Sequence, residues 1–201
     1  MRTERILSNN ITILTSQTNE GKTMLLCNLA IDYLTMYDGN VWSYGIRPQI
    51  TKQIDDILTF SSVLEMEQIR DSIILIDEVG ALFDLDNRKQ KRLIEHTLRH
   101  VTHNNNRIVM SGLPNDFKKF LASKATCFMW KSLTISDLIN GSLCKYLLLQ
   151  YAEADLGAYR LTVDKSQVIC YDPTGYWTDD VVYIKEFDTK INNKKLFLEK
   201  L

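Results

Sequence analysis

Residues 11–23 read ITILTSQTNEGKT, a short β-branched run that passes directly into a polar turn containing one glycine. A run of this kind over residues 11–16 is typical of a buried strand. Beyond the turn, apolar residues recur at helical spacing until a stop signal at residues 38–40, Asp-Gly-Asn. The sequence therefore predicts a strand, a tight loop and a helix in succession, which is the context that a phosphate-binding loop requires.

The turn matches the pattern G-x-x-x-x-G-K-[ST] at every fixed position except the first, where serine replaces glycine. Gly21 permits the backbone to approach phosphate closely, and the following helix points its positive end at the anion. Lys22 is expected to reach the β- and γ-phosphates, and the Thr23 hydroxyl to bind Mg²⁺. The residues expected to bind ATP are Ser16, Gln17, Thr18, Asn19, Glu20, Gly21, Lys22 and Thr23. The alternative is an ordinary polar strand-to-helix turn that happens to contain Gly-Lys-Thr.

A second apolar run, SIILIDE at residues 72–78, ends in two carboxylates. A strand buried on both faces accepts charge only at its carboxyl end, where ligands of open α/β sheets bind. We expect Asp77 to hold Mg²⁺, directly or through water, and Glu78 to polarise the attacking water. The 55 residues from Lys22 to Asp77 leave room for an intervening helix, strand and helix, which fits a strand order with another strand between the two motifs. A solvated acidic pair at the end of a strand is the alternative.

Three further runs predict strands, at residues 41–46, 107–112 and 125–133. Residues 50–70 read as helical or mixed, residues 87–103 as a polar helix, and residues 114–123 as a short helix that opens at proline. Strands that alternate with helices at this spacing are typical of a parallel sheet covered on both faces. We therefore predict an α/β phosphate-loop (P-loop) core over residues 1–135, with a mainly parallel five-stranded sheet between helices.

The remainder, residues 136–201, changes character. Short strands joined by turns are expected at residues 145–151, 159–163 and 167–171. This pattern predicts a C-terminal antiparallel β extension within the same compact unit, followed by a Lys/Asn-rich tail. The many tyrosines of this region are typical of core or edge packing, and a base-stacking platform for nucleic acid is the alternative.

Composition limits the classes of function. Twenty-four Lys and Arg residues stand against 25 Asp and Glu, so bulk positive charge cannot coat nucleic acid or an anionic membrane, although a local basic stripe can. The four cysteines show no C-x-x-C spacing, and three lie in apolar runs that predict buried, reduced thiols. The sequence shows neither a secretory segment nor an 18-residue apolar window, so we expect a cytoplasmic protein without an integral membrane segment.

Taken together, the phosphate loop, the acidic strand and a strand that ends in a small polar residue resemble the additional-strand class of P-loop ATPases. That class has a catalytic glutamate beside the metal-binding aspartate, and a polar sensor residue on its extra strand. Ser111 in RIVMSGLP, residues 107–114, is similar to that sensor. The resemblance covers about residues 10–132 and implies that Lys22, Glu78 and Ser111 are catalytic.

Within this class, the compact chain, the Ile-Asp-Glu end of the acidic strand and the Arg/His-rich helix before Ser-Gly-Leu-Pro resemble viral genome-packaging ATPases. Their FtsK–HerA relatives and the zonula-occludens-toxin-like assembly proteins of filamentous phages share these features. The resemblance implies a Mg²⁺-dependent ATP hydrolase that forms a homo-oligomeric ring and translocates double-stranded DNA. It also implies a viral capsid or portal protein as a further partner, with the protein in the host cytoplasm or associated with the virion.

Five cationic side chains share one face of the helix at 87–103, namely Arg88, Arg92, His96, Arg99 and His103. Three interpretations are open: a solvated stripe, an inter-subunit edge that carries an arginine finger, or a surface that faces DNA. In the resembling packaging motors a functional arginine falls in a similar stretch, which makes Arg99 the preferred finger and Arg107 the alternative. His96 and His100 have the spacing of a metal pair, but no Cys or carboxylate constellation completes a zinc site.

Two rival functions remain at this stage. One is an assembly or secretion ATPase that moves protein instead of DNA. The other is a small-molecule P-loop kinase, which needs an arginine-rich lid that residues 115–125 do not supply. A guanine-specific switch would need an N/T-K-x-D motif after a strand, and the sequence has none.

Overall fold

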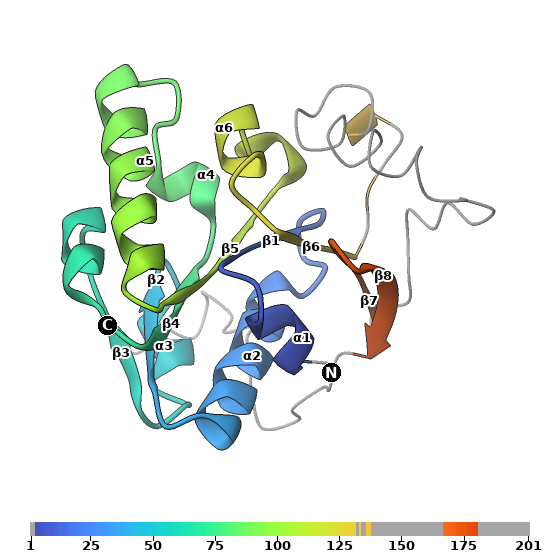
Figure 1. Ribbon diagram of the computed structural model, residues 1–201. Helices are drawn as coiled ribbons and strands as arrows, with labels where there is room; N and C mark the ends of the chain where they lie inside the picture. The colour runs from blue at the N-terminus through green and yellow to red at the C-terminus, as the bar shows by residue number, and fades with distance from the viewer. Residues whose placement is uncertain (1–2, 132, 134–135, 138–166, 181–201) are drawn as a thin grey trace, which may run out of the picture.

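A computed structural model describes residues 3–131, 133, 136–137 and 167–180 of the chain. These residues form a mixed α/β fold that is built around a single sheet (Figure 1). The strands are β1 (Ile11–Thr15), β2 (Asn40–Tyr44), β3 (Ile57–Thr59), β4 (Ser72–Ile76), β5 (Arg107–Gly112), β6 (Cys127–Trp130), β7 (Gln167–Asp172) and β8 (Gly175–Asp180). The helices are α1 (Thr3–Leu7), α2 (Lys22–Met36), α3 (Pro48–Thr51), α4 (Val79–Leu82), α5 (Arg88–His103) and α6 (Lys119–Ala122), with 3₁₀ turns η1 (Val63–Gln68) and η2 (Pro114–Asp116).

The sheet has the strand order β3-β2-β4-β5-β1-β6-β7-β8. All pairs from β3 to β6 are parallel, and β6–β7 and β7–β8 are antiparallel. Strand β5 lies between β1, which leads into the phosphate loop, and β4, which ends at the acidic pair. The predicted α/β fold, its C-terminal antiparallel extension and the strand inserted between the two motifs are therefore confirmed.

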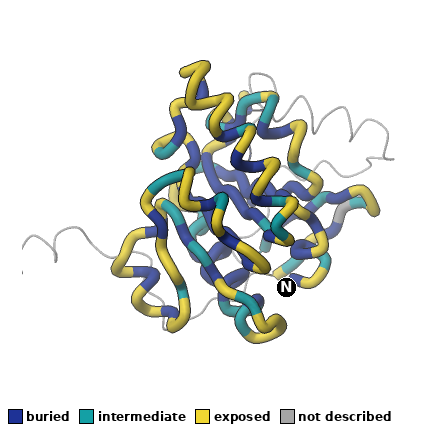
Figure 2. The backbone as a smooth tube through the Cα atoms, turned by 60° about the vertical axis from the view of Figure 1, so that its left-hand side comes forward, coloured by how far each residue is buried: buried dark blue, intermediate teal, exposed yellow. Residues whose placement is uncertain are grey.

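Along each strand the side chains point alternately to the two faces of the sheet. The core is therefore divided into two layers, one on each face. In β4, Ile74 and Ile76 pack with α5 on one face, whereas Ile73 and Leu75 pack with α1 and α2 on the other. All five residues of β4 are buried, as expected for a central parallel strand with both faces covered. Figure 2 shows the buried strands in the middle of the molecule, with exposed turns and helix faces around them.

The structure differs from the sequence-based expectation in the number of parallel strands. Six strands run parallel, not five, because Ile57–Thr59 forms the short edge strand β3 inside the segment expected to be helical or mixed. Three residues are too few to show a period of two, so the sequence pattern could not mark them. The expected short helix at residues 114–123 is two separate turns, η2 and α6.

In the C-terminal extension, the expected strand at residues 167–171 is β7, and β8 was not predicted. The expected strands at residues 145–151 and 159–163 lie outside the described residues. Cys27, Cys127 and Cys170 are buried free thiols, and burial raises the pKa of Cys27 and Cys127 to about 12.

Candidate active site

The phosphate loop connects β1 to α2 at the carboxyl edge of the sheet. Gly21 caps α2 with a left-handed backbone conformation, at φ 84° and ψ 27°, which glycine adopts without steric cost. Asn19 at the loop tip also has a positive φ, of 64°. Ser16, at the position where the pattern has glycine, is not among the positive-φ residues of the described chain, so its backbone does not require glycine. The serine side chain is fully buried, and its hydroxyl donates to the Gln17 carbonyl at 3.1 Å.

Lys22, the first residue of α2, curls back over the loop. Its Nζ donates to the carbonyl oxygens of Ser16 and Gln17, each at 3.0 Å. Of the other predicted loop residues, Thr18 and Asn19 are exposed, whereas Glu20 is half-buried. The lysine ammonium therefore lies at the mouth of the loop, where it can meet an anion held by the backbone amides.

Asp77 is the centre of a hydrogen-bonded cluster that joins three elements. It directly follows β4, is only 4% exposed, and its Oδ2 accepts from the Thr23 hydroxyl of α2 at 2.7 Å. Its Oδ1 accepts from the fully buried Ser111 hydroxyl of β5. Positions 23, 77 and 111, far apart in the sequence, thus meet at one carboxylate.

Glu78 has an unusual backbone for a residue other than glycine. Its φ and ψ are both 55°, in the left-handed region, and such conformations cost energy and gather at functional sites. The Glu78 amide donates to Asp77 Oδ1 at 3.1 Å, while the glutamate itself is exposed. The turn therefore fixes the aspartate and leaves the glutamate free to reach the space beside it.

Burial and four nearby carboxylates act on the charge of Lys22. Burial lowers the pKa of its ammonium, and the carboxylates of Asp77, Asp116, Glu78 and Glu20 oppose that change. Asp116, in the turn after β5, accepts from the Leu113 amide at 2.6 Å. It also lies so close to Gly80 that a Cβ there would be 2.2 Å from its Oδ1, which means that any larger residue at position 80 would displace this carboxylate.

The donor set fits a magnesium nucleotide. Thr23 and Asp77 offer a hydroxyl and a carboxylate oxygen, and Mg²⁺ prefers oxygen ligands from one or two protein groups together with phosphates and water. The loop backbone and the start of α2 offer amides suited to phosphate. With Glu78 beside them, these groups can carry out hydrolysis of a phosphoanhydride.

The predicted arginine finger lies away from this cluster. Arg99 is exposed in the C-terminal half of α5, and its side chain makes no hydrogen bond or ion pair with any described residue. Arg107, the alternative, is engaged within its own chain, since its Nε donates to the Leu7 carbonyl at 2.8 Å. The exposed face of α5 also carries the other four cationic residues predicted to share it, Arg88, Arg92, His96 and His103.

The two histidines with metal-pair spacing do lie together. The Nε2 atoms of His96 and His100 are 3.1 Å apart, and His96 Nδ1 is 3.5 Å from Glu67 Oε1. Within residues 3–131, 133, 136–137 and 167–180, no group of three or more His, Cys, Asp or Glu side chains is arranged to hold a metal ion.

Sequence reasoning missed three residues that contact the site. Asp116 is one, and Lys131 and Asp137 are the others: Lys131 approaches Gly21, and Asp137 Oδ2 accepts from Gln17 Nε2 at 2.5 Å. Lys131 could have been found, because it directly follows a buried strand, as Asp77 does. Asp137 carries no such signal, because its partner lies 120 residues away.

The strand order and the loop define the fold of P-loop NTPases with an additional strand between the two motifs. The sequence matches no protein-family model and no curated protein. Among solved structures, it is similar to the genome-packaging NTPase B204 from Sulfolobus turreted icosahedral virus 2 in complex with AMP. The TM-score is 0.64 at 13% identity, over 87% of this chain and 98% of that one.

Two further structures are similar. B204, the DNA-packaging ATPase from Sulfolobus Turreted Icosahedral Virus, gives a TM-score of 0.62 at 13% identity, over 87% of this chain and 98% of that one. ATPases 2 and 3 of EccC from Thermomonospora curvata, in complex with a signal sequence peptide, give 0.60 at 7% identity, over 89% of this chain and 37% of that one. At these identities the likeness concerns the fold, and the expected P-loop fold is confirmed. None of the helices in the described part of the chain is both long and apolar enough to cross a membrane.

Proposed function

We propose that this chain is a Mg²⁺-dependent ATPase that hydrolyses ATP to ADP and phosphate. The observation that carries the proposal is the convergence of Thr23 and Ser111 on Asp77 beside the phosphate loop. In a solvated acidic pair Asp77 would be exposed, whereas it is only 4% exposed. An ordinary polar turn would not supply a hydroxyl to a carboxylate at the end of another strand. The two alternatives raised by the sequence are therefore less consistent with the geometry than an ATPase site.

The roles follow from the positions. Residues 16–23 bind the phosphates of ATP, and Lys22 neutralises charge on the β- and γ-phosphates. Thr23 and Asp77 hold Mg²⁺, which when bound offsets the charge that develops on the transferred phosphoryl group. Glu78 accepts a proton from the attacking water. Ser111 holds Asp77 in place and senses the terminal phosphate through that contact.

We further propose that the ATPase works as a homo-oligomeric ring that translocates double-stranded DNA, as the motor that packages a viral genome. In support, the fold covers 98% of the length of the packaging NTPase B204, so little of that chain lacks a counterpart here. Arg99 is exposed on α5, as a finger that reaches a neighbouring subunit must be. A capsid or portal protein would then anchor the ring, in the host cytoplasm or on the virion.

We also propose that residues 1–135 form the ATPase core and that residues 136–201 form an extension of the same unit. The described part of the extension, β7 and β8, continues the sheet of the core beyond β6.

An assay of phosphate release by the purified protein tests these proposals. The rate is measured with Mg²⁺ or with EDTA, and in each case without DNA, with single-stranded DNA and with double-stranded DNA. Lys22→Ala should abolish turnover, because it removes the cation at the β- and γ-phosphates without touching the core. Turnover within a few-fold of wild type in that variant would rule out a catalytic phosphate loop. If wild type turns over ATP but neither form of DNA changes the rate, the ATPase stands and the DNA translocase is rejected.

The second candidate is an assembly or secretion ATPase that moves protein. Its support is the fold shared with EccC ATPases, which were solved with a signal sequence peptide. Turnover that rises with an unfolded polypeptide and not with DNA would favour it. A small-molecule kinase is less consistent with the structure, since residues 113–126 between β5 and β6 form two short turns and contain no arginine.

A further inference from the structure

Lys131 is a buried lysine at the carboxyl end of β6. It is only 3% exposed, a degree of burial that lysine rarely reaches unless its charge is compensated. The preceding residue, Trp130, pairs in register with Thr15 of β1. Because Ser16 follows Thr15, Lys131 leaves the sheet beside the first residue of the phosphate loop.

The ammonium of Lys131 lies against the end of that loop. A Cβ atom on Gly21 would be 3.5 Å from Lys131 Nζ, and Gly21 is the N-cap of the 15-residue helix α2. The N-terminus of a helix carries partial positive charge, so it repels a cation and attracts an anion. Two lysines, Lys22 and Lys131, therefore approach a position that already favours negative charge.

The segment after β6 contacts the loop at a second point. Gln17 Nε2 donates to Asp137 Oδ2 at 2.5 Å, and Asp137 is 9% exposed. Lys131 and Asp137 also interact with other groups of the chain. Because Lys131 is only 3% exposed, its side chain has little conformational freedom left to lose when a ligand binds beside the loop.

We propose that Lys131 is a second phosphate-binding residue, which contacts the phosphate chain of a nucleoside di- or triphosphate from the β6 side of the loop. The inference rests on the proposed ATPase function and adds a residue to its site. Since the loop and the start of α2 cradle the phosphates, a lysine beside Gly21 should strengthen binding of ADP and ATP and leave AMP nearly unaffected.

Isothermal titration calorimetry with Mg²⁺ and ADP, ATP or AMP tests this for three variants. Lys131→Met removes the charge and keeps the aliphatic stem, Lys131→Arg keeps the charge, and Lys124→Met is the control at an exposed lysine. Lys131→Met should lower the affinity for ADP and for ATP roughly tenfold or more, as expected for a lost hydrogen bond to a charged group. AMP affinity should change less than about twofold. Lys131→Arg should recover most of the ADP affinity, and Lys124→Met should match wild type.

A purely structural lysine would give a different pattern. ADP affinity within twofold of wild type in a folded Lys131→Met protein would overturn the inference, as would equal losses for AMP and ADP. Wild-type protein that binds no nucleotide would overturn the proposed function and the inference together. Unchanged ADP affinity in the variant, beside normal wild-type binding, would overturn the inference alone.

A measurement on the wild type covers the case in which Lys131→Met does not fold. An acyl phosphate of ATP transfers its acyl group to a lysine amine near the phosphates: an amide bond forms, the acyl–phosphate bond breaks, and ATP leaves. Mass spectrometry should find the label on Lys131, with excess ADP preventing it, and no label on Lys124. Protein labelled at Lys22 and not at Lys131 would overturn the inference.

Discussion

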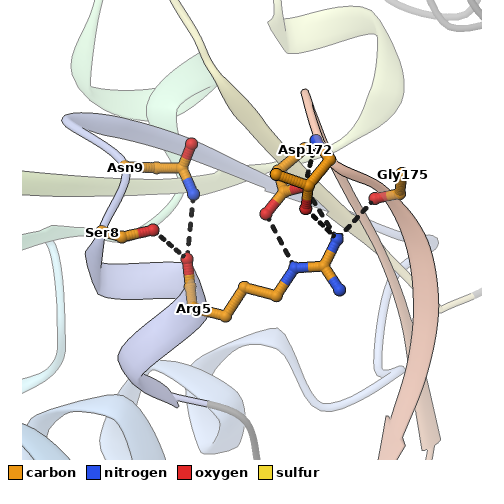
Figure 3. Close-up of polar contacts among 6 residues, drawn as sticks. Arg5, Ser8, Asn9, Asp172 and Gly175 are labelled. Atoms are coloured by element: carbon orange, nitrogen blue, oxygen red, sulfur yellow. Dashed lines mark hydrogen bonds and ion pairs between the residues drawn. The ribbon is translucent and has the colours of Figure 1, made fainter.

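Replacing Asp172 with asparagine should destabilise the protein by about 1–2 kcal/mol at neutral pH and less in acid. Asp172 ends β7 and binds Arg5 of α1 through two parallel bonds, from Nε to Oδ2 and from Nη2 to Oδ1, each 2.8 Å long (Figure 3). The Arg5 guanidinium also lies 3.6 Å from the centre of the Trp177 ring. This contact joins the N-terminal helix to the C-terminal hairpin, so it tests whether the extension belongs to the same folding unit as the core.

The magnitude comes from the pKa of the carboxyl. The hydrogen bonds from Arg5, against the opposing effect of burial and with help from Thr174, lower the pKa of Asp172 from 3.8 to about 2. One pKa unit corresponds to about 1.4 kcal/mol, so the lowered pKa sets an upper limit of about 2.5 kcal/mol on the stabilisation that ionised Asp172 contributes. The Arg5 side chain is 28% exposed, so solvent weakens its attraction to Asp172. We therefore expect Asp172→Asn to lower the free energy of unfolding by about 1–2 kcal/mol.

The sign of the pH dependence follows from the lowered pKa. The stabilisation requires the ionised carboxylate, so it is complete above pH 3.8 and is lost as the pH falls toward about 2. Urea unfolding followed by circular dichroism at pH 7 and at pH 3 measures it in wild type and in Asp172→Asn. The difference between the two proteins should fall to about half at pH 3.

The exposed Asp55 offers the matched control, since Asp55→Asn removes a carboxylate that makes no hydrogen bond or ion pair with the described residues. It should unfold like wild type at both pH values. A loss of stability in Asp172→Asn that is the same at pH 7 and pH 3 would refute the electrostatic reasoning. No loss at pH 7 would refute the idea that the hairpin is held to the core by this pair.

Four further predictions concern turnover and the site. Glu78→Gln should keep Mg²⁺–ATP binding and lose hydrolysis in a phosphate-release assay, because it preserves shape and removes the base; normal turnover would remove Glu78 from the mechanism. Asp77→Asn should instead weaken binding in a Mg²⁺-dependent way, measured by calorimetry with and without EDTA, and equal losses under both conditions would contradict the metal role. Ser111→Ala should cost about 1–3 kcal/mol in urea unfolding, because it removes a donor from a buried carboxylate, and a cost near zero would mean that the Asp77 contact is not stabilising. Arg99→Ala should leave ATP affinity intact and lower turnover by about 10³–10⁵; mixing it with Lys22→Ala should restore part of the activity if the finger acts in trans, and no recovery in confirmed rings would exclude that role.

Much of the fold could be predicted from the sequence because its decisive signals are local. The strand at residues 11–15, the loop and the helix are contiguous, and their order alone fixes where an anion can sit. The insertion of a strand between β1 and β4 agreed with the spacing of the two motifs, and the resemblance to additional-strand P-loop ATPases indicated that it is the strand with Ser111, which is β5.

What the sequence could not show depends on contacts between distant segments. Nothing near Arg5 indicates that it will bind Asp172, 167 residues away. Asp137 contacts Gln17, 120 residues away, and no signal in the sequence around residue 137 marks that contact. The edge strand β3 was missed for a third reason, because three residues paired to one neighbour carry too little hydrophobic pattern.

The order of the strands also explains why acidic side chains lie at one end of the site and a lysine at the other. The carboxyl ends of β4, β5, β1 and β6 lie side by side, and they present Asp77, Ser111, the phosphate loop and Lys131 in that sequence. Glu78 and Asp116 lie at the β4 and β5 end of this row, and Lys131 lies at the other end. The Lys22 ammonium bonds to the loop carbonyls and interacts electrostatically with the acids. A ligand that suits such a row has a cation at one end and a phosphate chain at the other. A magnesium nucleotide has this charge arrangement, whereas a bare phosphate chain would extend toward three carboxylates and be repelled by them.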